Sequence, residues 1–478
     1  SIAHKRDLDG YGVYVADYIT GEPVKTCDIL QAQRFRQLFR IEKIDPAAVH
    51  AFIGGGQDFE QTILLSDCQK KAADWKAAIA DGKATVEVSL GAVTDAGNND
   101  TKTRGLAFEV ELRDRQGHIV DHRHTSLDTP EITMIVERPQ LWTPETPYLY
   151  KAHIKLMDNG RVIDETTQNV GIRTVKVSKE GGFQLNGITR KIKGVCLHHD
   201  LGPLGAAINK AALIRQLKTM KEMGCDAIRT SHNMPSQMQM DLCDSLGLMV
   251  MAESFDMWIY PKCKNGYARF FKEWSDRDIE SLVRANRNHP SIVMWSIGNE
   301  IPEQGDKNAI AIIDRLQGLC HKLDPSRPVT QGLDRVDNAL ASGFAQAMDI
   351  PGLNYRLQKY EKAYNTLTHG FLLGSETTST VSSRGVYKFP VQTNDYSRFS
   401  SWTPTYDPTA VRDADGQCSG YDVEHCAWSN LPDDDWRRQE DYPWVIGEFV
   451  WTGYDYLGEP TPYDEYWPSR SSYFGICD

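Results

Sequence analysis

From about residue 183 onward, short apolar runs alternate with stretches of helical periodicity, and this alternation limits the fold more than any other feature of the chain. The expected strands are 191–197, 226–230, 248–252, 292–297, 329–331, 349–353, 371–374 and 445–451. Helical patterns at 210–223, 237–246, 276–288 and 308–323 lie between them. Eight such repeats predict an α/β fold, a closed (β/α)8 TIM barrel over 179–478, which typically needs about 250 residues. The residues beyond that length are expected to form an insertion over 377–442. The segment after 451 is short for the last helix of such a barrel.

A different pattern precedes the barrel. Polar and apolar residues alternate at 85–90, 106–112, 132–136, 148–156 and 174–177, with turn residues between these runs. Short alternating strands predict an immunoglobulin-like β-sandwich over 83–178, a domain of about 100 residues. Residues 1–82 are left as an unassigned N-terminal segment, with helices expected at 45–48 and 70–79.

Charge and composition restrict the partners. The formal net charge of -12 disfavours nucleic acid, whose phosphates need a basic surface, and also anchoring to an anionic membrane. No run of 18 apolar residues is present, so we expect no membrane span. The first residues lack the pattern of a secretory leader. The ten cysteines are scattered, and the compartment stays open, cytoplasm or periplasm, as does the oligomeric state, a homo-oligomer included.

Polar and aromatic residues follow most of the predicted barrel strands. They stand at 198–200, 229–233, 253–256, 298–300, 354–356, 375–376 and 451–455. Because the active sites of such barrels form at the carboxyl ends of the strands, we expect these side chains to gather at one mouth. So many polar groups at one end of a barrel favour a binding or catalytic site.

Two glutamates stand out among them. Glu300 follows the fourth strand and Glu376 the seventh, so the two face each other across the predicted barrel. Glycosidic cleavage needs such a pair, one acid and one nucleophile, held about 5–5.5 Å apart in retaining enzymes. For either glutamate taken alone, membership of an ion pair at a strand end is an equally good interpretation. Glu448 and Glu459 are competing candidates for the nucleophile.

The motifs in this region resemble those of glycoside hydrolase family 2, and most of all its bacterial β-galactosidases. The matching stretches are FQLNG at 183–187, KGVCLHHD at 193–200, IRTSHN at 228–233, NHPSI at 288–292, WSIGNE at 295–300 and GSE at 374–376. The resemblance implies Glu300 as the general acid/base and Glu376 as the nucleophile. It covers about four fifths of the chain and includes the expected sandwich, but residues 1–82 do not look like the sugar-binding jelly roll with which family members usually begin.

The resemblance also implies roles for the residues around the glutamates. Asn299 is similar to a ligand of the sugar 2-hydroxyl, Tyr355 to a tyrosine that orients the nucleophile, and Arg229 to a partner of a catalytic carboxylate. The remaining substrate-binding candidates are His198, Asp200, His232, Asn233 and Trp451. A lone histidine or tryptophan at a strand end can equally be a structural residue.

No cofactor is required by this chemistry. Some members of the family hold Mg²⁺ or Na⁺, for which Glu253 and Asp256 would be the ligands here. His198 and His199 do not read as a zinc pair, because successive side chains of a strand point to opposite faces. We therefore assign no metal ligand among the site residues and expect no zinc site, whereas Mg²⁺ or Na⁺ at Glu253 and Asp256 stays open.

The expected function is that of a retaining exo-β-glycosidase acting on a carbohydrate substrate. The sequence LGEPTP at 457–462 resembles the β-galactosidase branch. β-Glucuronidases of the family place an Asn-x-Lys motif near the barrel end, where this chain offers only Arg470. β-Glucuronidase and β-mannosidase stay open as alternatives, as does a catalytically impaired carbohydrate-binding protein.

Overall fold

The structure is a computed structural model that describes residues 2–7, 10–16, 23–27, 73–91, 105–383, 385–386, 420–423, 425–426, 428–458 and 472–477. At the N-terminus, strands β1 (Ile2–Asp7), β2 (Gly10–Ala16) and β3 (Pro23–Cys27) form an antiparallel sheet of their own. The helix expected at 45–48 and most of the insertion expected at 377–442 lie outside the described residues.

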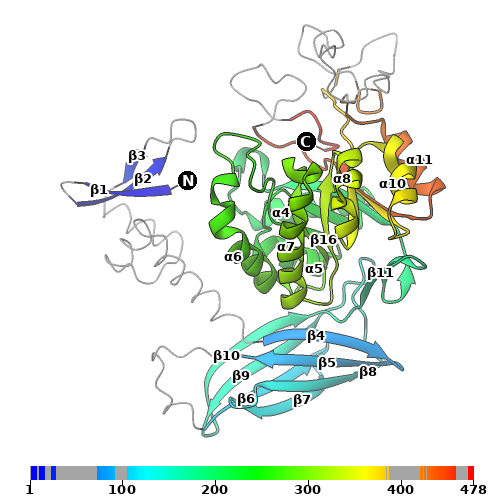
Figure 1. The fold of residues 1–478 in the computed structure, drawn as a ribbon. Coiled ribbons are helices and arrows are strands. Elements are labelled where there is room, and N and C mark those ends of the chain that lie inside the picture. The colour runs from blue at the N-terminus through cyan, green and yellow to red at the C-terminus, as the bar shows by residue number, and fades with distance from the viewer. Residues whose placement is uncertain are drawn as a thin grey trace.

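The predicted β-sandwich is confirmed (Figure 1). One sheet has the order β4-β5-β8 and the other β10-β9-β6-β7. Their bounds are β4 (Ala73–Ala80), β5 (Lys83–Leu90), β6 (Leu106–Arg113), β7 (Ile119–Ser126), β8 (Glu131–Glu137), β9 (Tyr150–Asp158) and β10 (Arg161–Val170). Val86, Val88, Phe108 and Val110 are buried between the sheets, as strict alternation requires.

The helix expected at 70–79 is wrong for the part that the structure describes, because residues 73–79 belong to strand β4. It pairs antiparallel with β5 from Ala73↔Leu90 to Ala80↔Lys83. The alanine- and lysine-rich composition favours a helix, but Asp81 and Gly82 both take positive φ, 51° and 74°, and form a two-residue hairpin turn. Tertiary pairing therefore overrides local propensity, and the sandwich begins ten residues before the expected boundary at 83.

Two further strands of the sandwich, β7 and β10, were not expected from the sequence. Each lies at an edge of its sheet and exposes most of its side chains. An edge strand of this kind shows little hydrophobic alternation, which is the signal on which the prediction depends. The run at 174–177 is strand β11 (Val175–Ser178), which pairs with β12 (Gly182–Leu185) and not with the sandwich.

The predicted eight-stranded barrel is also confirmed: β14 to β21 close in sequence order, every neighbouring pair is parallel, and β21 pairs back onto β14. The strands are β14 (Ile192–His198), β15 (Ala227–Ser231), β16 (Met249–Glu253), β17 (Ile292–Asn299), β18 (Val329–Leu333), β19 (Ile350–Asn354), β20 (Leu372–Thr378) and β21 (Val445–Trp451). Each overlaps its predicted run.

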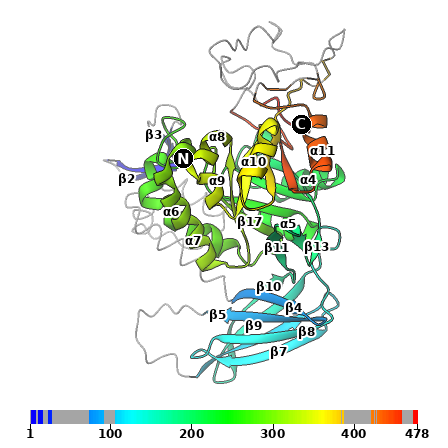
Figure 2. The same cartoon turned by 45° about the vertical axis from the view of Figure 1, so that its right-hand side comes forward.

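Helices surround the barrel, as Figure 2 shows in a second view. The longer ones are α4 (Lys210–Glu222), α5 (Gln237–Leu246), α6 (Ala268–Asn286), α7 (Ile310–Leu323) and α11 (Pro432–Asp441). The shorter ones are α8 (Val336–Ser342), α9 (Phe344–Ala347) and α10 (Tyr360–Thr366). Within the described part of the chain, no helix is both long enough and apolar enough to cross a membrane.

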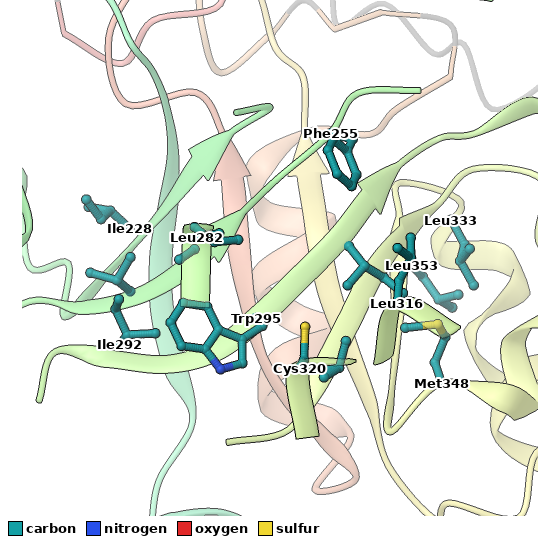
Figure 3. Close-up of a cluster of buried hydrophobic side chains, with 14 of the residues drawn as sticks. Ile228, Phe255, Leu282, Ile292, Trp295, Leu316, Cys320, Leu333, Met348 and Leu353 are labelled. Atoms are coloured by element: carbon teal, nitrogen blue, oxygen red, sulfur yellow. The ribbon is translucent and has the colours of Figure 1, made fainter. Parts of the chain in front are cut away.

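A continuous apolar layer between strands and helices fixes the barrel (Figure 3). Ile228, Ile292 and Trp295 project from the strands toward the helices, where Leu282 and Leu316 meet them, and all five side chains are buried. Burying such side chains is worth about 1.5–3 kcal/mol each, so this layer holds the strand ends in fixed positions.

The sandwich is bound to the end of the barrel where β17 begins. Trp142 Nε1 donates to the Asp244 carbonyl at 2.8 Å, and the buried Arg173 donates to the carbonyls of Pro290 and Ile292 at 3.0 and 2.6 Å. These contacts lie at the amino end of β17, opposite the end that carries Glu300. The sandwich therefore leaves the mouth of the barrel open.

Candidate active site

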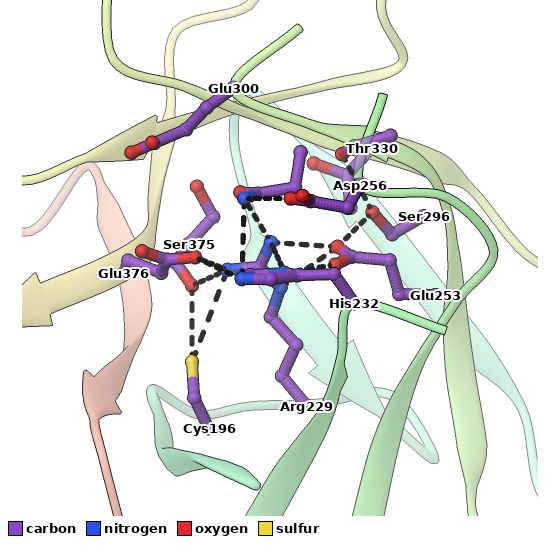
Figure 4. A network of polar contacts seen from close by, with 12 residues as sticks. Cys196, Arg229, His232, Glu253, Asp256, Ser296, Glu300, Thr330, Ser375 and Glu376 are labelled. Carbon is purple, nitrogen blue, oxygen red and sulfur yellow. Dashed lines mark hydrogen bonds and ion pairs between the residues drawn. The ribbon is translucent and has the colours of Figure 1, made fainter. Parts of the chain in front are cut away.

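The polar strand ends meet at one mouth of the barrel, as expected from their positions in the sequence (Figure 4). Glu300 follows β17 and Glu376 lies within β20. Glu300 and Tyr355 take φ of 42° and 57°, which is uncommon for residues other than glycine. These turns direct both side chains out of the strand path at the mouth.

Glu376 is held from two sides by hydrogen-bond donors. Its Oε1 accepts from Arg229 Nη1 at 2.8 Å, and its Oε2 accepts from the Tyr355 hydroxyl, also at 2.8 Å. Glu376 is 3% exposed, so water contributes little to the solvation of its carboxylate. A carboxylate that accepts two such bonds is fixed in orientation, with little freedom to rotate.

Arg229 is the centre of the site. It is fully buried and donates from Nε to Glu253 Oε2 at 2.9 Å and from Nη2 to Asn299 Oδ1, also at 2.9 Å, in addition to Glu376. Although burial lowers its pKa, Glu253 and Glu376 raise it above the ordinary value, so the guanidinium keeps its charge. The charge of Arg229 thus lies between two buried carboxylates.

Two asparagines connect the glutamates. Asn354 Nδ2 donates to Glu300 Oε1 at 3.0 Å and to Asn299 Oδ1 at 2.9 Å, and Asn354 Oδ1 accepts from Ser375 Oγ at 2.7 Å. Asn354 was not among the site residues expected from the sequence. Its position at the end of β19, next to Tyr355, is the sequence signal by which it could have been found.

The two glutamates have different electrostatic environments. Burial raises the pKa of Glu300 to about 8, and the nearby Asp334 and Glu376 add to the effect. Burial also raises the pKa of Glu376, to about 7, but Arg229 and Tyr355 oppose that shift. Glu376 therefore ionises first, and its negative charge then favours the protonated form of Glu300. Pairs of carboxyls separated in this way can act as acid and nucleophile.

An aromatic wall borders the carboxylates. The His232 ring is stacked on Trp451 with centroids 5.3 Å apart, and the His198 ring lies 4.0 Å from that of Tyr456. Burial lowers the pKa of His198 to about 3 and that of His232 well below its ordinary value, so both imidazoles are neutral. Neutral rings and a tryptophan face suit the hydroxyls and apolar faces of a sugar.

His198 also carries an unused hydrogen-bonding group. Among the described residues, its buried Nε2 has no hydrogen-bond partner. The same side chain lines a pocket together with Asp200 and Gln216. A buried polar atom without a partner is rare in a folded protein, and a ligand in this pocket would satisfy it.

Two expected site residues lie apart from this network. Asp200 lines the pocket beside His198, and its carboxylate accepts the Gly202 N–H at 2.7 Å, while Asn233 is exposed. No hydrogen bond between described residues joins either side chain to the carboxylates. They are therefore placed at the border of the mouth.

Of the competing glutamates, Glu448 is described and Glu459 lies outside the described residues. Glu448 accepts from the Thr377 hydroxyl at 2.7 Å, and its charge acts on Asp435 of α11. Since Thr377 follows Glu376 along β20, it points to the other side of that strand. Glu448 is therefore next to the helices and away from the mouth.

The residues considered for Mg²⁺ or Na⁺ are engaged by hydrogen-bond donors of the protein. Both oxygens of Glu253 are engaged, Oε2 by Arg229 and by Ser296 Oγ at 2.6 Å, and Oε1 by His232 Nδ1 at 2.7 Å. Asp256 accepts from Lys262 and Asn299. Protein donors thus engage both oxygens of Glu253 and Oδ1 of Asp256.

Comparisons with known proteins agree with this geometry. The sequence model described as "Glycosyl hydrolases family 2, TIM barrel domain" matches residues 175–401, and "Glycosyl hydrolases family 2" matches 72–173. The β-galactosidase BoGH2A of Bacteroides ovatus is 36% identical over 81% of this chain and 49% of its own length. A putative β-glucuronidase of Formosa agariphila is 34% identical over 74% of this chain and 34% of its own length.

Solved structures agree as well. A β-glycosidase from Bacteroides vulgatus superposes with a TM-score of 0.72 at 32% identity, over 85% of this chain and 52% of that one. The chain spans about half the length, or less, of these curated relatives. Because both family models match in consecutive order and the barrel and sandwich have the corresponding folds, the chain belongs to glycosyl hydrolase family 2.

Proposed function

We propose that this protein is a retaining exo-β-glycosidase that hydrolyses terminal β-D-galactosides. The observation that carries the proposal is the contrast between the two glutamates. Arg229 and Tyr355 donate hydrogen bonds to Glu376, which fix its orientation and favour the ionised carboxylate that a nucleophile needs. Glu300 lies in an environment that raises its pKa to about 8, so it keeps a proton near neutral pH.

The reaction follows from these states. Glu376 attacks the anomeric carbon while Glu300 protonates the leaving oxygen, which gives a glycosyl-enzyme and the free aglycone. Glu300, now a carboxylate, takes a proton from water, which attacks the same carbon and releases the sugar and Glu376. Two inversions return the original anomer. In this proposal Asn299 binds the sugar 2-hydroxyl, and His198, His232 and Trp451 contact the rest of the ring.

The choice of β-galactoside is supported by the 36% identity to BoGH2A. A β-glucuronidase is the second candidate, since a protein of that printed name in Formosa agariphila is 34% identical over 74% of this chain. The neutral His198 and His232 offer no charge to a sugar carboxylate, so among the groups near the site that role would fall to Lys262 at the rim.

The test is hydrolysis of matched nitrophenyl β-galactoside, β-glucuronide and β-mannoside by the purified protein. Release from the galactoside, with NMR detection of the β-anomer as first product, supports the proposal. Release from another sugar keeps the mechanism and overturns the substrate. No release from any of the three favours a carbohydrate-binding protein without activity.

The roles of the glutamates are tested on the best substrate. Glu376→Gln abolishes turnover, whereas Glu300→Gln keeps part of it on the nitrophenyl glycoside, because a good leaving group needs little protonation. Azide should restore product release in Glu376→Gln as an inverted glycosyl azide. Equal loss in both variants, without azide rescue, contradicts the assignment.

A further inference from the structure

The loop that follows β16 places a lysine at the rim of the candidate site. Lys262 Nζ donates to Asp256 Oδ1 at 2.8 Å, and the same oxygen accepts from Asn299 Nδ2 at 3.1 Å. The side chains of Lys262 and Asp256 are 26% and 37% exposed, so the pair borders the solvent. The ammonium is thus three hydrogen bonds away from Arg229, which donates to Asn299.

This loop is fixed to the segment after β17, which contains the acid/base candidate Glu300. Glu303 Oε1 accepts the backbone N–H groups of Ile259 and Tyr260, each at 2.8 Å. Glu303 is 3% exposed and stands three residues after Glu300. A buried carboxylate with two backbone donors holds a loop firmly, because charge-assisted hydrogen bonds are strong. Lys262 is therefore held near the site and is not an ordinary surface lysine.

The charge of Lys262 acts on the whole site. It lowers the pKa of Glu253, Glu300 and Glu376, in each case against a larger effect of burial. The groups that face Glu300 are Asp334 after β18, Asn354 on β19, Glu376 on β20 and this lysine. Those that face Glu376 are Arg229, His232, Glu253, Glu300, Tyr355 and the same lysine.

We propose, on the basis of the function proposed above, that Lys262 is a positioning residue of the active site, which orients Asn299 through Asp256 and stabilises the negative charge that both glutamates carry during the reaction. When Glu300 gives its proton to the leaving oxygen it becomes a carboxylate beside Asp334 and Glu376. A fixed ammonium at the rim offsets that accumulation of charge.

The test compares three variants of one loop. Lys262→Met removes the charge and the hydrogen bond, Lys262→Arg keeps both, and Lys264→Met removes a charge from an exposed lysine two residues farther on. The measurement is kcat/KM against pH on the best nitrophenyl glycoside. In Lys262→Met both limbs of the profile should move to higher pH by roughly half a unit or more, because both carboxyls lose a stabilising charge. Lys262→Arg and Lys264→Met should keep the profile of the unchanged protein.

A merely structural lysine would lower the rate without moving the limbs, and that result in Lys262→Met overturns the proposal. An equal shift in Lys264→Met would also overturn it.

A second measurement does not need activity, namely thermal unfolding at pH 5.5 and 8.5. Lys262→Met should lose more stability at pH 8.5 than at 5.5, since it destabilises carboxylates that are ionised at the higher pH. Inactivity of the unchanged protein contradicts the proposed function, whereas the absence of this pH-dependent loss contradicts the role of Lys262.

Discussion

Replacing Tyr355 by phenylalanine removes a single hydrogen bond from the proposed nucleophile. The phenol donates to Glu376 Oε2 at 2.8 Å, and both residues are buried, with 6% and 3% exposure. A hydrogen bond to a charged group is worth about 1.5–3 kcal/mol, which corresponds to a loss of roughly 10- to 100-fold in kcat/KM. The ring stays, so the packing changes little.

The pH dependence gives the sharper result. The phenol stabilises the ionised form of Glu376, and its loss should raise a pKa that is already about 7. Because the nucleophile must be ionised, the acidic limb of kcat/KM should move to higher pH, and the deficit should be largest below neutral pH. The basic limb, which follows Glu300, should move less.

The control is Tyr360→Phe. This tyrosine is also fully buried, and among the described residues its hydroxyl has no hydrogen-bond partner. It should keep the rate and the acidic limb of the unchanged protein. If Tyr355→Phe keeps its acidic limb and loses less than about 2-fold in rate, the phenol does not support the nucleophile.

Three further predictions concern other parts of the barrel. Burial raises the pKa of Glu448 from 4.5 to about 7, so the folded state loses stability as the pH rises through this window. Glu448→Gln should therefore raise the free energy of unfolding by up to about 3 kcal/mol at pH 8 and not at pH 4. The variant should keep its hydrolytic activity. An inactive Glu448→Gln would restore this residue as a candidate nucleophile. Asn354→Ala removes the donor to Glu300 and should slow a methyl glycoside roughly 10-fold more than a nitrophenyl glycoside; equal slowing would argue against an effect through the acid. Gly447 has a φ of 144°, and Gly447→Ala places a Cβ against the backbone nitrogen of Ile192. The free energy of unfolding in denaturant should fall by more than about 2 kcal/mol. An unchanged midpoint would contradict the close approach of β14 and β21.

Much of the fold was predictable because it rests on local signals. The barrel strands are buried on both faces and read as short apolar runs, so all eight were found. Strand β4 was missed because its four alanines and Lys76 favour a helix, and only the pairing with β5 makes it a strand. The edge strands β7 and β10 were missed because their exposed residues carry little hydrophobic pattern.

The sequence by itself determined which residues reach the mouth, since every parallel strand delivers its carboxyl end to the same side of a barrel. That is why Glu300, Glu376 and Arg229 could be named in advance. Only the tertiary structure decided how they interact. The bridge from Asn354 to Glu300 and the bond from Asn299 to Asp256, which Lys262 also contacts, join segments that are far apart in the chain. Charges and hydrogen bonds act over a few ångströms of space, and no spacing along the sequence specifies that distance.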